Sequence, residues 1–131
     1  ITPEMRVHCS GRAWYYNRFY HCWKPQGHGS MDLHHAIKHS CDCYFYKAAE
    51  LTGIEAIAEM AKKFGLGHRY ELGLTGGKAG VMPNDAWKRE AVGEQWYAGD
   101  TISAAIGQGY VTTTPFQLAV MTARIAGGHQ A

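Results

Sequence analysis

The sequence has little charge of either sign. Asp, Glu, Lys and Arg make up 18% of the 131 residues, whereas an average protein has about 25%, and the net charge is +2 with histidine neutral. A nucleic-acid-binding surface or an acidic tail requires an excess of one sign, and this composition supports neither. We therefore expect no nucleic-acid partner.

The chain also lacks a long hydrophobic run. No window approaches eighteen consecutive apolar residues, so no transmembrane helix is expected within it. The first residues, ITPEMRVHCSG, lack the charged and apolar regions of a signal peptide, and any membrane anchor is expected outside this chain. The length suits one domain with a modest core. The last residues, ARIAGGHQA, resemble a loop, which suggests a piece of a longer protein.

Cysteine is scarce, but its spacing predicts a metal site. The candidate ligands Cys9, Cys22, His28 and Cys41 are separated by twelve, five and twelve residues. Three thiolates and one imidazole form a closed tetrahedral set of the kind that structural zinc takes. No CxxC knuckle is present, so the pattern is not that of a zinc finger or ribbon.

The segment between the first and third candidate ligands favours the same interpretation. It contains Gly11, Pro25 and Gly27 as breakers and has no helical periodicity, so we expect no packed element there. A bound zinc would supply the missing order. The sequence therefore predicts a zinc-ordered loop region over residues 1–30.

Two disulfides are the alternative use of four cysteines, and the sequence cannot give their pairing. Cys41 and Cys43 are too close to bond each other comfortably, so each would need Cys9 or Cys22, which crowds two bridges into one place. The spacing favours zinc.

Among eight histidines, His28 is preferred because Gly27 and Gly29 allow the backbone to turn its ring inward. His21 and His8 each lie beside a cysteine and are alternative ligands. Cys43 could replace one thiolate, although we interpret it as a small buried residue.

Residues 31–131 are expected to be mainly helical. A short helix is predicted over Met31–His39 with Ser30 as its N-cap, followed by one long helix or two over Asp42–Phe64, interrupted at Thr52-Gly53. Glycines near residue 65 should end this helix. Further predictions are a glycine-rich loop with a short strand over Gly65–Pro83 and a final helix, Phe116–Ile125, opened by Pro115.

Two long segments, SCDCYFYKAAELTGIEAIAEMAKKFGLG and WYAGDTISAAIGQGYVTTTPFQLAVMTARIAGG, closely resemble the transpeptidase domain of class B penicillin-binding proteins. The upstream HCWKPQGHG is most similar to the elongation-specific members. The resemblance extends from about Cys9 to Gly128. It implies the helical part of the serine D,D-transpeptidase fold, a mainly α class with short strands.

The resemblance implies an enzyme that cross-links peptidoglycan stem peptides and is acylated by β-lactams. That fold uses Ser-x-x-Lys, Ser-x-Asn or Ser-x-Asp, and Lys-Ser/Thr-Gly motifs. Only the middle motif is present, as Ser40-Cys41-Asp42, because no serine is followed by lysine three residues later and the nearest third-motif match, Gly77-Lys78-Ala79-Gly80, lacks a hydroxyl. The isolated chain is therefore expected to be inactive in acyl transfer.

The resemblance assigns catalytic roles to two residues of this middle motif. It implies that the Ser40 hydroxyl relays protons between the lysine of the first motif and the leaving amine. Asp42 would pair with that lysine and hydrogen-bond the substrate amide. Taken without the resemblance, Ser40 would be a plain N-cap and Asp42 would stabilise the first turn of a helix.

The resemblance also bears on metal, partners and location. Some relatives carry zinc beside this motif, and the matching ligand positions here are His28, Cys41, Cys22 and, less closely, Cys9. Implied partners are stem peptides, β-lactams and elongation-complex proteins. The implied location is the periplasmic side of the bacterial inner membrane.

Two other functions are compatible with the residues. The chain could be a free-standing zinc-binding interaction module without enzymatic activity, with an aromatic recognition surface formed by Trp14, Tyr15, Tyr16, Phe19, Tyr20 and Trp23. It could also be a cysteine hydrolase using Cys41 or Cys43, although no oxyanion element is visible.

Overall fold

The computed structural model describes residues 1–67, 80–113 and 115–128. The chain forms two compact units, Ile1–Gly53 with Tyr97–Gln108, and Ile54–Trp96 with Gly109–Ala131. Within the described parts of both units, no helix has the length and apolar character needed to cross a bilayer. The architecture is mainly helical with short strands, which confirms the predicted class.

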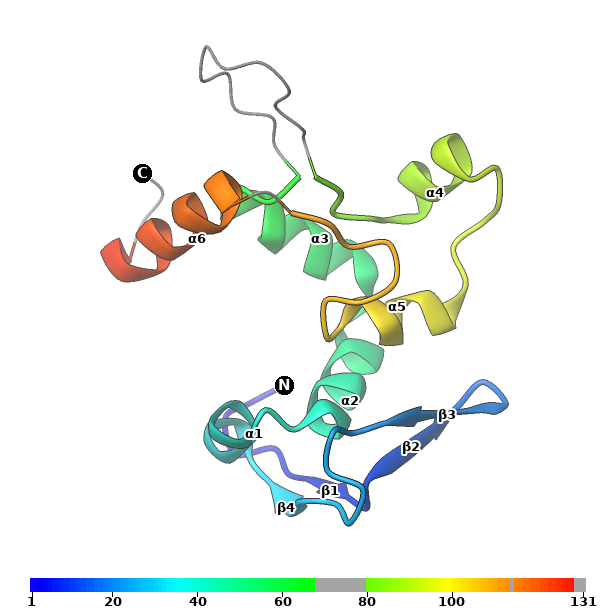
Figure 1. Ribbon diagram of the computed structural model, residues 1–131, viewed down its shortest axis with the longest axis vertical. Helices are drawn as coiled ribbons and strands as arrows, with labels where there is room; N and C mark the ends of the chain where they lie inside the picture. Colours follow the sequence, from blue (N-terminus) through cyan, green and yellow to red (C-terminus); the bar gives the residue numbers. More distant parts are fainter. Residues whose placement is uncertain (68–79, 114, 129–131) are drawn as a thin grey trace. The chain divides into compact units, whose positions relative to one another are not determined.

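The first unit combines two small antiparallel sheets with three helices (Figure 1). One sheet pairs β1 with β4, and the other pairs β2 with β3. The elements are β1 (Val7–Cys9), β2 (Arg12–Tyr15), β3 (Arg18–His21), β4 (Gly29–Met31), α1 (Leu33–His39), α2 (Asp42–Thr52) and α5 (Ala98–Ala104).

The β2–β3 hairpin lies where we predicted an unpaired loop, and that prediction is wrong. Tyr16 and Asn17 connect the strands with φ values of 51° and 63°, the positive pair typical of a tight two-residue hairpin turn. Trp14 lies opposite Phe19, and their ring centroids are 4.7 Å apart in an edge-to-face arrangement. Backbone pairing and aromatic contacts therefore contribute to the order of this segment.

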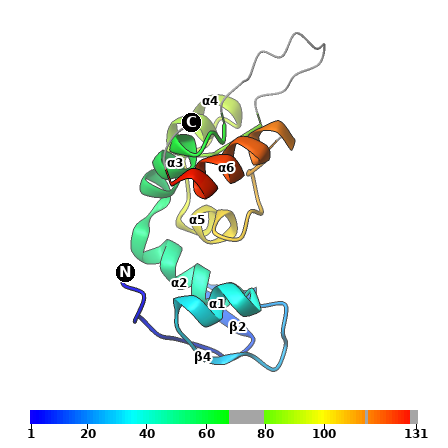
Figure 2. The ribbon, with the colours of Figure 1, turned by 90° about the vertical axis from the view of Figure 1, so that its left-hand side faces the viewer.

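Helix α2 is central to the core of the first unit. One buried cluster consists of Cys9, Cys22, Met31, Ala36, Cys41, Cys43 and Tyr44. A second joins Tyr20, Tyr46 and Ile102, from β3, α2 and α5. The Tyr46 hydroxyl donates to the His21 carbonyl at 2.6 Å and fastens β3 to α2. Helix α1 packs against both α2 and β4 (Figure 2).

The first predicted helix begins two residues too early. Ser30 and Met31 belong to β4, and the N-cap is Asp32, whose carboxylate accepts the backbone N–H of His35 at 2.9 Å. Pairing of β4 with β1 outweighs the helical preference of Met31. The second prediction is confirmed as two helices, since Gly53, with φ of 86°, separates α2 from α3 (Ile54–Lys63).

The second unit contains α3, α4 (Asp85–Ala91) and α6 (Pro115–Gly127). Helix α3 ends in the predicted glycine cap, because Gly65 has φ of 91° and the N–H of Leu66 reaches the carbonyl of Ala61 at 3.0 Å. Helix α6 begins at Pro115 as predicted. Helices α4 and α5 were not predicted. Most of the predicted Gly65–Pro83 loop lies outside the described residues.

Candidate functional site

The four predicted metal ligands come together in the first unit. Cys9 ends β1, Cys22 follows β3, His28 precedes β4, and Cys41 lies between α1 and α2. One ligand atom from each residue lies within 4.8 Å of the others. The three cysteines are nearly inaccessible, with exposed fractions of 1%, 6% and 0%. Segments distant in sequence thus place a sulfur-rich ligand set inside the core.

The spacing of these atoms fits a tetrahedral ion. Nδ1 of His28 lies 3.6 Å from Sγ of Cys9 and 3.5 Å from Sγ of Cys22. A tetrahedral zinc bonded to sulfur at about 2.3 Å and to nitrogen at about 2.0 Å separates those two ligand atoms by about 3.5 Å. These distances show that His28 directs Nδ1 toward the sulfurs. The other ring nitrogen, Nε2, is buried without a hydrogen-bond partner among the described residues.

Two glycines let the 22–28 loop approach β1. A Cβ on Gly27 would lie 2.3 Å from the Cys9 carbonyl oxygen, and a Cβ on Gly11 would lie 2.2 Å from that of Pro25. Gly27 has φ of 84° and Gly29 has φ of 75°, so the expected backbone turn around His28 is present. Any larger residue at position 11 or 27 would push the loop, and with it two candidate ligands, away from Cys9.

The electrostatics of the cluster favour a bound cation. Burial raises the pKa of Cys9, but hydrogen bonds from the backbone and ring of His28 outweigh it and lower the pKa to about 6. Burial, followed by the nearby Cys9, raises the pKa of Cys41 to about 12. Thiolates this close repel one another, so the cluster can hold one negative charge readily and needs a cation to hold more.

The alternative ligands do not join this cluster. Among the described residues, the only group of three or more candidate ligands is Cys9, Cys22, His28 and Cys41, and both His8 and His21 are exposed. Cys43 is 2% exposed and packs in the core, as predicted. All four cysteines are free thiols, so the disulfide alternative is not realised. Burial of Cys41 and Cys43 also makes either thiol a poor hydrolase nucleophile.

Ser40, Cys41 and Asp42 form the turn between α1 and α2. Ser40 is exposed and has φ of 53° and ψ of 48°, the left-handed conformation that few non-glycine residues adopt. Its N–H caps α1, and Cys41 is the N-cap of α2. A strained, exposed serine beside a buried ligand cysteine makes this turn the candidate catalytic element.

A hollow of about 410 Å³ opens beside Asp42. The backbone N–H of Trp23 donates to Oδ2 of Asp42 at 3.0 Å, so one carboxylate oxygen already binds the 22–28 loop. The lining residues are Arg18, Phe19, Tyr20, His21, Cys22, Trp23, Asp42, Tyr46, Ser103, Ile106 and Gln108. The hollow therefore has Asp42 and one candidate metal ligand in its wall.

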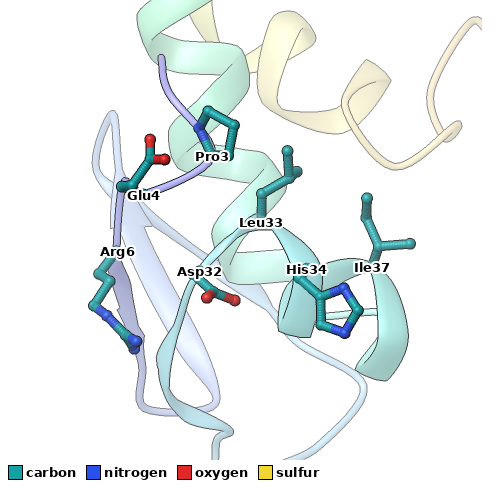
Figure 3. Close-up of a pocket in the computed structure, with 7 residues that line it drawn as sticks. All are labelled: Pro3, Glu4, Arg6, Asp32, Leu33, His34 and Ile37. Atoms are coloured by element: carbon teal, nitrogen blue, oxygen red, sulfur yellow. The ribbon is translucent and has the colours of Figure 1, made fainter.

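A second hollow, of about 660 Å³, lies at the start of α1. Figure 3 shows the residues that line it: Pro3, Glu4, Arg6, Asp32, Leu33, His34 and Ile37. Its walls carry acidic and basic groups together. None of the candidate metal ligands and no residue of the Ser40-Cys41-Asp42 turn lines it. It is therefore not part of the candidate site.

Comparisons with known proteins identify the family. Residues 1–130 match the family described as the penicillin-binding protein transpeptidase domain. The chain belongs to this family. It is 42% identical over 109 residues to the peptidoglycan D,D-transpeptidase MrdA of Acinetobacter baumannii, an alignment that covers 82% of this chain and 16% of that relative. The resemblance inferred from the sequence is confirmed.

Solved structures of the penicillin-binding protein PBP2 share the fold of this chain. Pseudomonas aeruginosa PBP2 in complex with WCK 5153 has a TM-score of 0.90 and 39% identity, covering 96% of this chain and 28% of that one. PBP2 in its complex with MreC from Helicobacter pylori has a TM-score of 0.91 and 32% identity. The match covers 98% of this chain and 24% of that one. The transpeptidase chain thus spans a minor part of these relatives.

Sequence reasoning found all four residues of the cluster and the turn, but it missed Trp23. The sequence analysis placed Trp23 in an aromatic run that could form a recognition surface. In the structure its backbone N–H donates to Asp42 and its indole N–H donates to the His39 carbonyl. The available signal was its place in the loop between two candidate ligands, directly after Cys22.

Proposed function

We propose that this chain contributes the Ser-x-Asp motif and a structural zinc site to a peptidoglycan D,D-transpeptidase that builds the elongating cell wall and is a target of β-lactams. Family membership and the name of the Acinetobacter baumannii relative support the reaction class. Because the sequence contains no Ser-x-x-Lys and no Lys-Thr-Gly, the isolated chain is inactive in acyl transfer under this proposal.

The observation that carries the proposal is the position of Cys41. Its buried sulfur belongs to the ligand cluster, and its two chain neighbours are Ser40 and Asp42. A metal held there would restrain the turn that aims both polar side chains. The same residue thus joins a structural role to a catalytic one.

Ser40 and Asp42 would act on protons and charge without attacking the substrate. The exposed hydroxyl of Ser40 would pass a proton between the lysine of the absent first motif and the leaving amine. The carboxylate of Asp42, with Oδ2 occupied by the N–H of Trp23, would pair with that lysine and orient the substrate amide.

The residues present fit zinc. Cys9, Cys22, His28 and Cys41 would hold it, and soft thiolates favour this ion over the hard cations magnesium and calcium. With four protein ligands, no coordination position remains for water, so the ion would supply structural order without Lewis-acid chemistry.

Proposed partners and location follow from the relatives. A related PBP2 is seen with MreC, which supports elongation-complex proteins as partners. Stem peptides and β-lactams would bind the full-length enzyme. Cell-wall synthesis of this kind supports the periplasmic side of the inner membrane, with an anchor outside this chain.

The test uses the full-length transpeptidase that carries this segment. Fluorescent penicillin should acylate it, and Ser40→Ala should slow acylation with zinc content unchanged. Ser30→Ala, which alters an exposed serine in β4, is the matched control. Normal acylation of the Ser40→Ala variant would remove the catalytic part of the proposal.

A second candidate is a zinc-binding interaction module without enzymatic activity. Trp14 is 57% exposed on the hairpin, and the guanidinium of Arg12 lies 4.0 Å from the ring centroid of the exposed Phe19. Exposed aromatic and cationic groups on one face suit recognition of another molecule. Absence of acylation of the full-length protein by fluorescent penicillin, together with loss of a bound partner in the Trp14→Ala, Phe19→Ala variant, would favour this role.

A further inference from the structure

Trp23 makes two hydrogen bonds that bracket the Ser40 turn. Its backbone N–H donates to Oδ2 of Asp42 at 3.0 Å, and its indole Nε1–H donates to the carbonyl oxygen of His39 at 3.0 Å. In the sequence, His39 immediately precedes Ser40 and Asp42 immediately follows Cys41. One residue therefore holds both ends of the turn.

The same residue is tied to the ligand cluster. Trp23 directly follows Cys22, and its ring centroid lies 5.1 Å from that of His28 in an edge-to-face arrangement. Movement of either ligand would displace the indole. The 22–28 loop thus connects two candidate ligands with the two ends of the turn.

Burial does not explain the position of Trp23. Its side chain is 61% exposed, so little apolar contact holds the ring in place. The polar anchors and the His28 contact define its position instead. An exposed tryptophan held by two hydrogen bonds differs from a core residue that merely fills space.

Ordinary helix capping does not explain the bond to Asp42 either. Asp42 is the first residue of α2, where a carboxylate commonly stabilises the helix dipole, and the N-cap Cys41 makes no side-chain cap hydrogen bond. Oδ2 of Asp42 nevertheless accepts an N–H from a different segment, nineteen residues earlier. The bond fixes the carboxylate of Asp42 relative to the ligand loop.

We propose that Trp23 is a positioning residue that transmits the order of the metal cluster to Ser40 and Asp42. This inference rests on the proposed function of the site. The two Trp23 hydrogen bonds flank Ser40, whose left-handed conformation caps α1. One of these bonds holds Oδ2 of Asp42, so that the remaining carboxylate oxygen keeps one direction. Order imposed by the metal reaches the turn through the indole as well as through Cys41.

The first test measures acylation kinetics of the full-length transpeptidase by fluorescent penicillin. Trp23→Phe removes the indole N–H and keeps the ring and the backbone N–H. We expect the maximal acylation rate to fall about 2- to 10-fold, the effect of one lost hydrogen bond, with zinc content and half-saturating concentration unchanged. Trp14→Phe, on the exposed hairpin, is the matched control and should leave the rate unchanged.

Comparison with Ser40→Ala distinguishes failure of the proposed function from failure of the positioning role of Trp23. If Ser40→Ala acylates normally, the proposed function fails. If Ser40→Ala is slow while Trp23→Phe matches wild type, only the positioning role of Trp23 fails. A Trp23→Phe enzyme that loses zinc in proportion to its activity would also overturn the inference, because Trp23 would then act on the metal site alone.

The second test uses hydrogen exchange in the full-length transpeptidase without substitution, so it does not depend on a variant folding. With zinc bound, the indole and backbone N–H groups of Trp23 should exchange at least about 10-fold more slowly than the indole of Trp14. Chelation should remove this protection, together with that of the Cys41 N–H, which bonds to the Ala36 carbonyl at 2.9 Å. Equal exchange of both indoles in the zinc-bound protein would overturn the proposal.

Discussion

Nδ1 of His28 lies 3.6 Å from Sγ of Cys9 although the two residues are nineteen positions apart in the sequence, and no residue of the β2–β3 hairpin takes part in this contact. The hairpin is held by its own strand pairing and by the contact of β3 with α2, whereas the ring and the thiol hold each other. Removing the metal should therefore disturb the ligand loop far more than the hairpin.

We expect about one zinc per chain in protein purified without added metal. X-ray absorption at the zinc edge should show three sulfur ligands at about 2.3 Å and one nitrogen at about 2.0 Å. Cys9→Ser should reduce retained zinc under chelator challenge, because it replaces a soft ligand. Two disulfides with no metal, found by thiol counting and elemental analysis, would contradict this prediction.

Chelation at neutral pH should lower the melting temperature by at least about 10 °C, because the ion stabilises only the folded ligand set. In NMR spectra, signals of the 22–28 loop and of Ser40 should shift or broaden, while Trp14 and Phe19 keep their cross-strand contacts. An unchanged melting curve after complete metal removal would show that the cluster contributes no order.

Ionisation of Tyr46 should make the stability of the fold depend on pH. Burial raises the pKa of Tyr46 to about 12, and its hydroxyl donates to the His21 carbonyl. The folded pKa exceeds the ordinary value of 10.0, so the folded state favours the protonated hydroxyl. The stability that this hydroxyl contributes is full below pH 10 and is lost as the pH rises toward 12. Tyr46→Phe should be less stable by about 1 kcal/mol at pH 8.

Denaturant unfolding of both proteins at several pH values checks the Tyr46 prediction. The stability difference between wild type and Tyr46→Phe should shrink between pH 10 and pH 12. A difference that stays constant over this range would mean that Tyr46 ionises equally in the folded and unfolded states.

The ligand residues could be chosen from the sequence because thiolate chemistry and the flanking glycines restrict the options. Gly27 and Gly29 carry a local signal, since positive φ depends on the residue itself. The hairpin could not be foreseen in the same way, because pairing of Trp14 with Phe19 depends on a Tyr16-Asn17 turn that lacks the usual glycine.

The sequence indicated Trp23 only through its place directly after Cys22, and its contacts could not be predicted for a different reason. Its two acceptors, the His39 carbonyl and the Asp42 carboxylate, lie sixteen and nineteen residues away, and only the folded loop brings them near. Asp32 shows the opposite case. The local signal favoured Ser30 as the N-cap, but pairing of β4 moved the start of α1 past Ser30 and left Asp32 as the cap.

The isolated chain should not be labelled by fluorescent penicillin, whereas the full-length enzyme should be. Ser40 has no lysine three residues later to activate it, and its predicted role is proton relay. In the full-length enzyme, Ser40→Ala should slow acylation by about 10²- to 10⁴-fold, the usual effect of losing a positioned proton carrier. Stable labelling of Ser40 in the isolated chain would reverse the role given to the motif.

The most direct test of coupling between metal and turn compares Cys41→Ala with Cys43→Ala in the full-length transpeptidase. Both thiols are buried, at 0% and 2% exposure, but only Cys41 belongs to the ligand cluster. Zinc content and the rate of acylation by penicillin are measured on the same samples. Cys41→Ala should lose zinc and acylate slowly, while Cys43→Ala should keep its zinc and its acylation rate. A Cys41→Ala enzyme that lost zinc yet acylated at the normal rate would contradict the account.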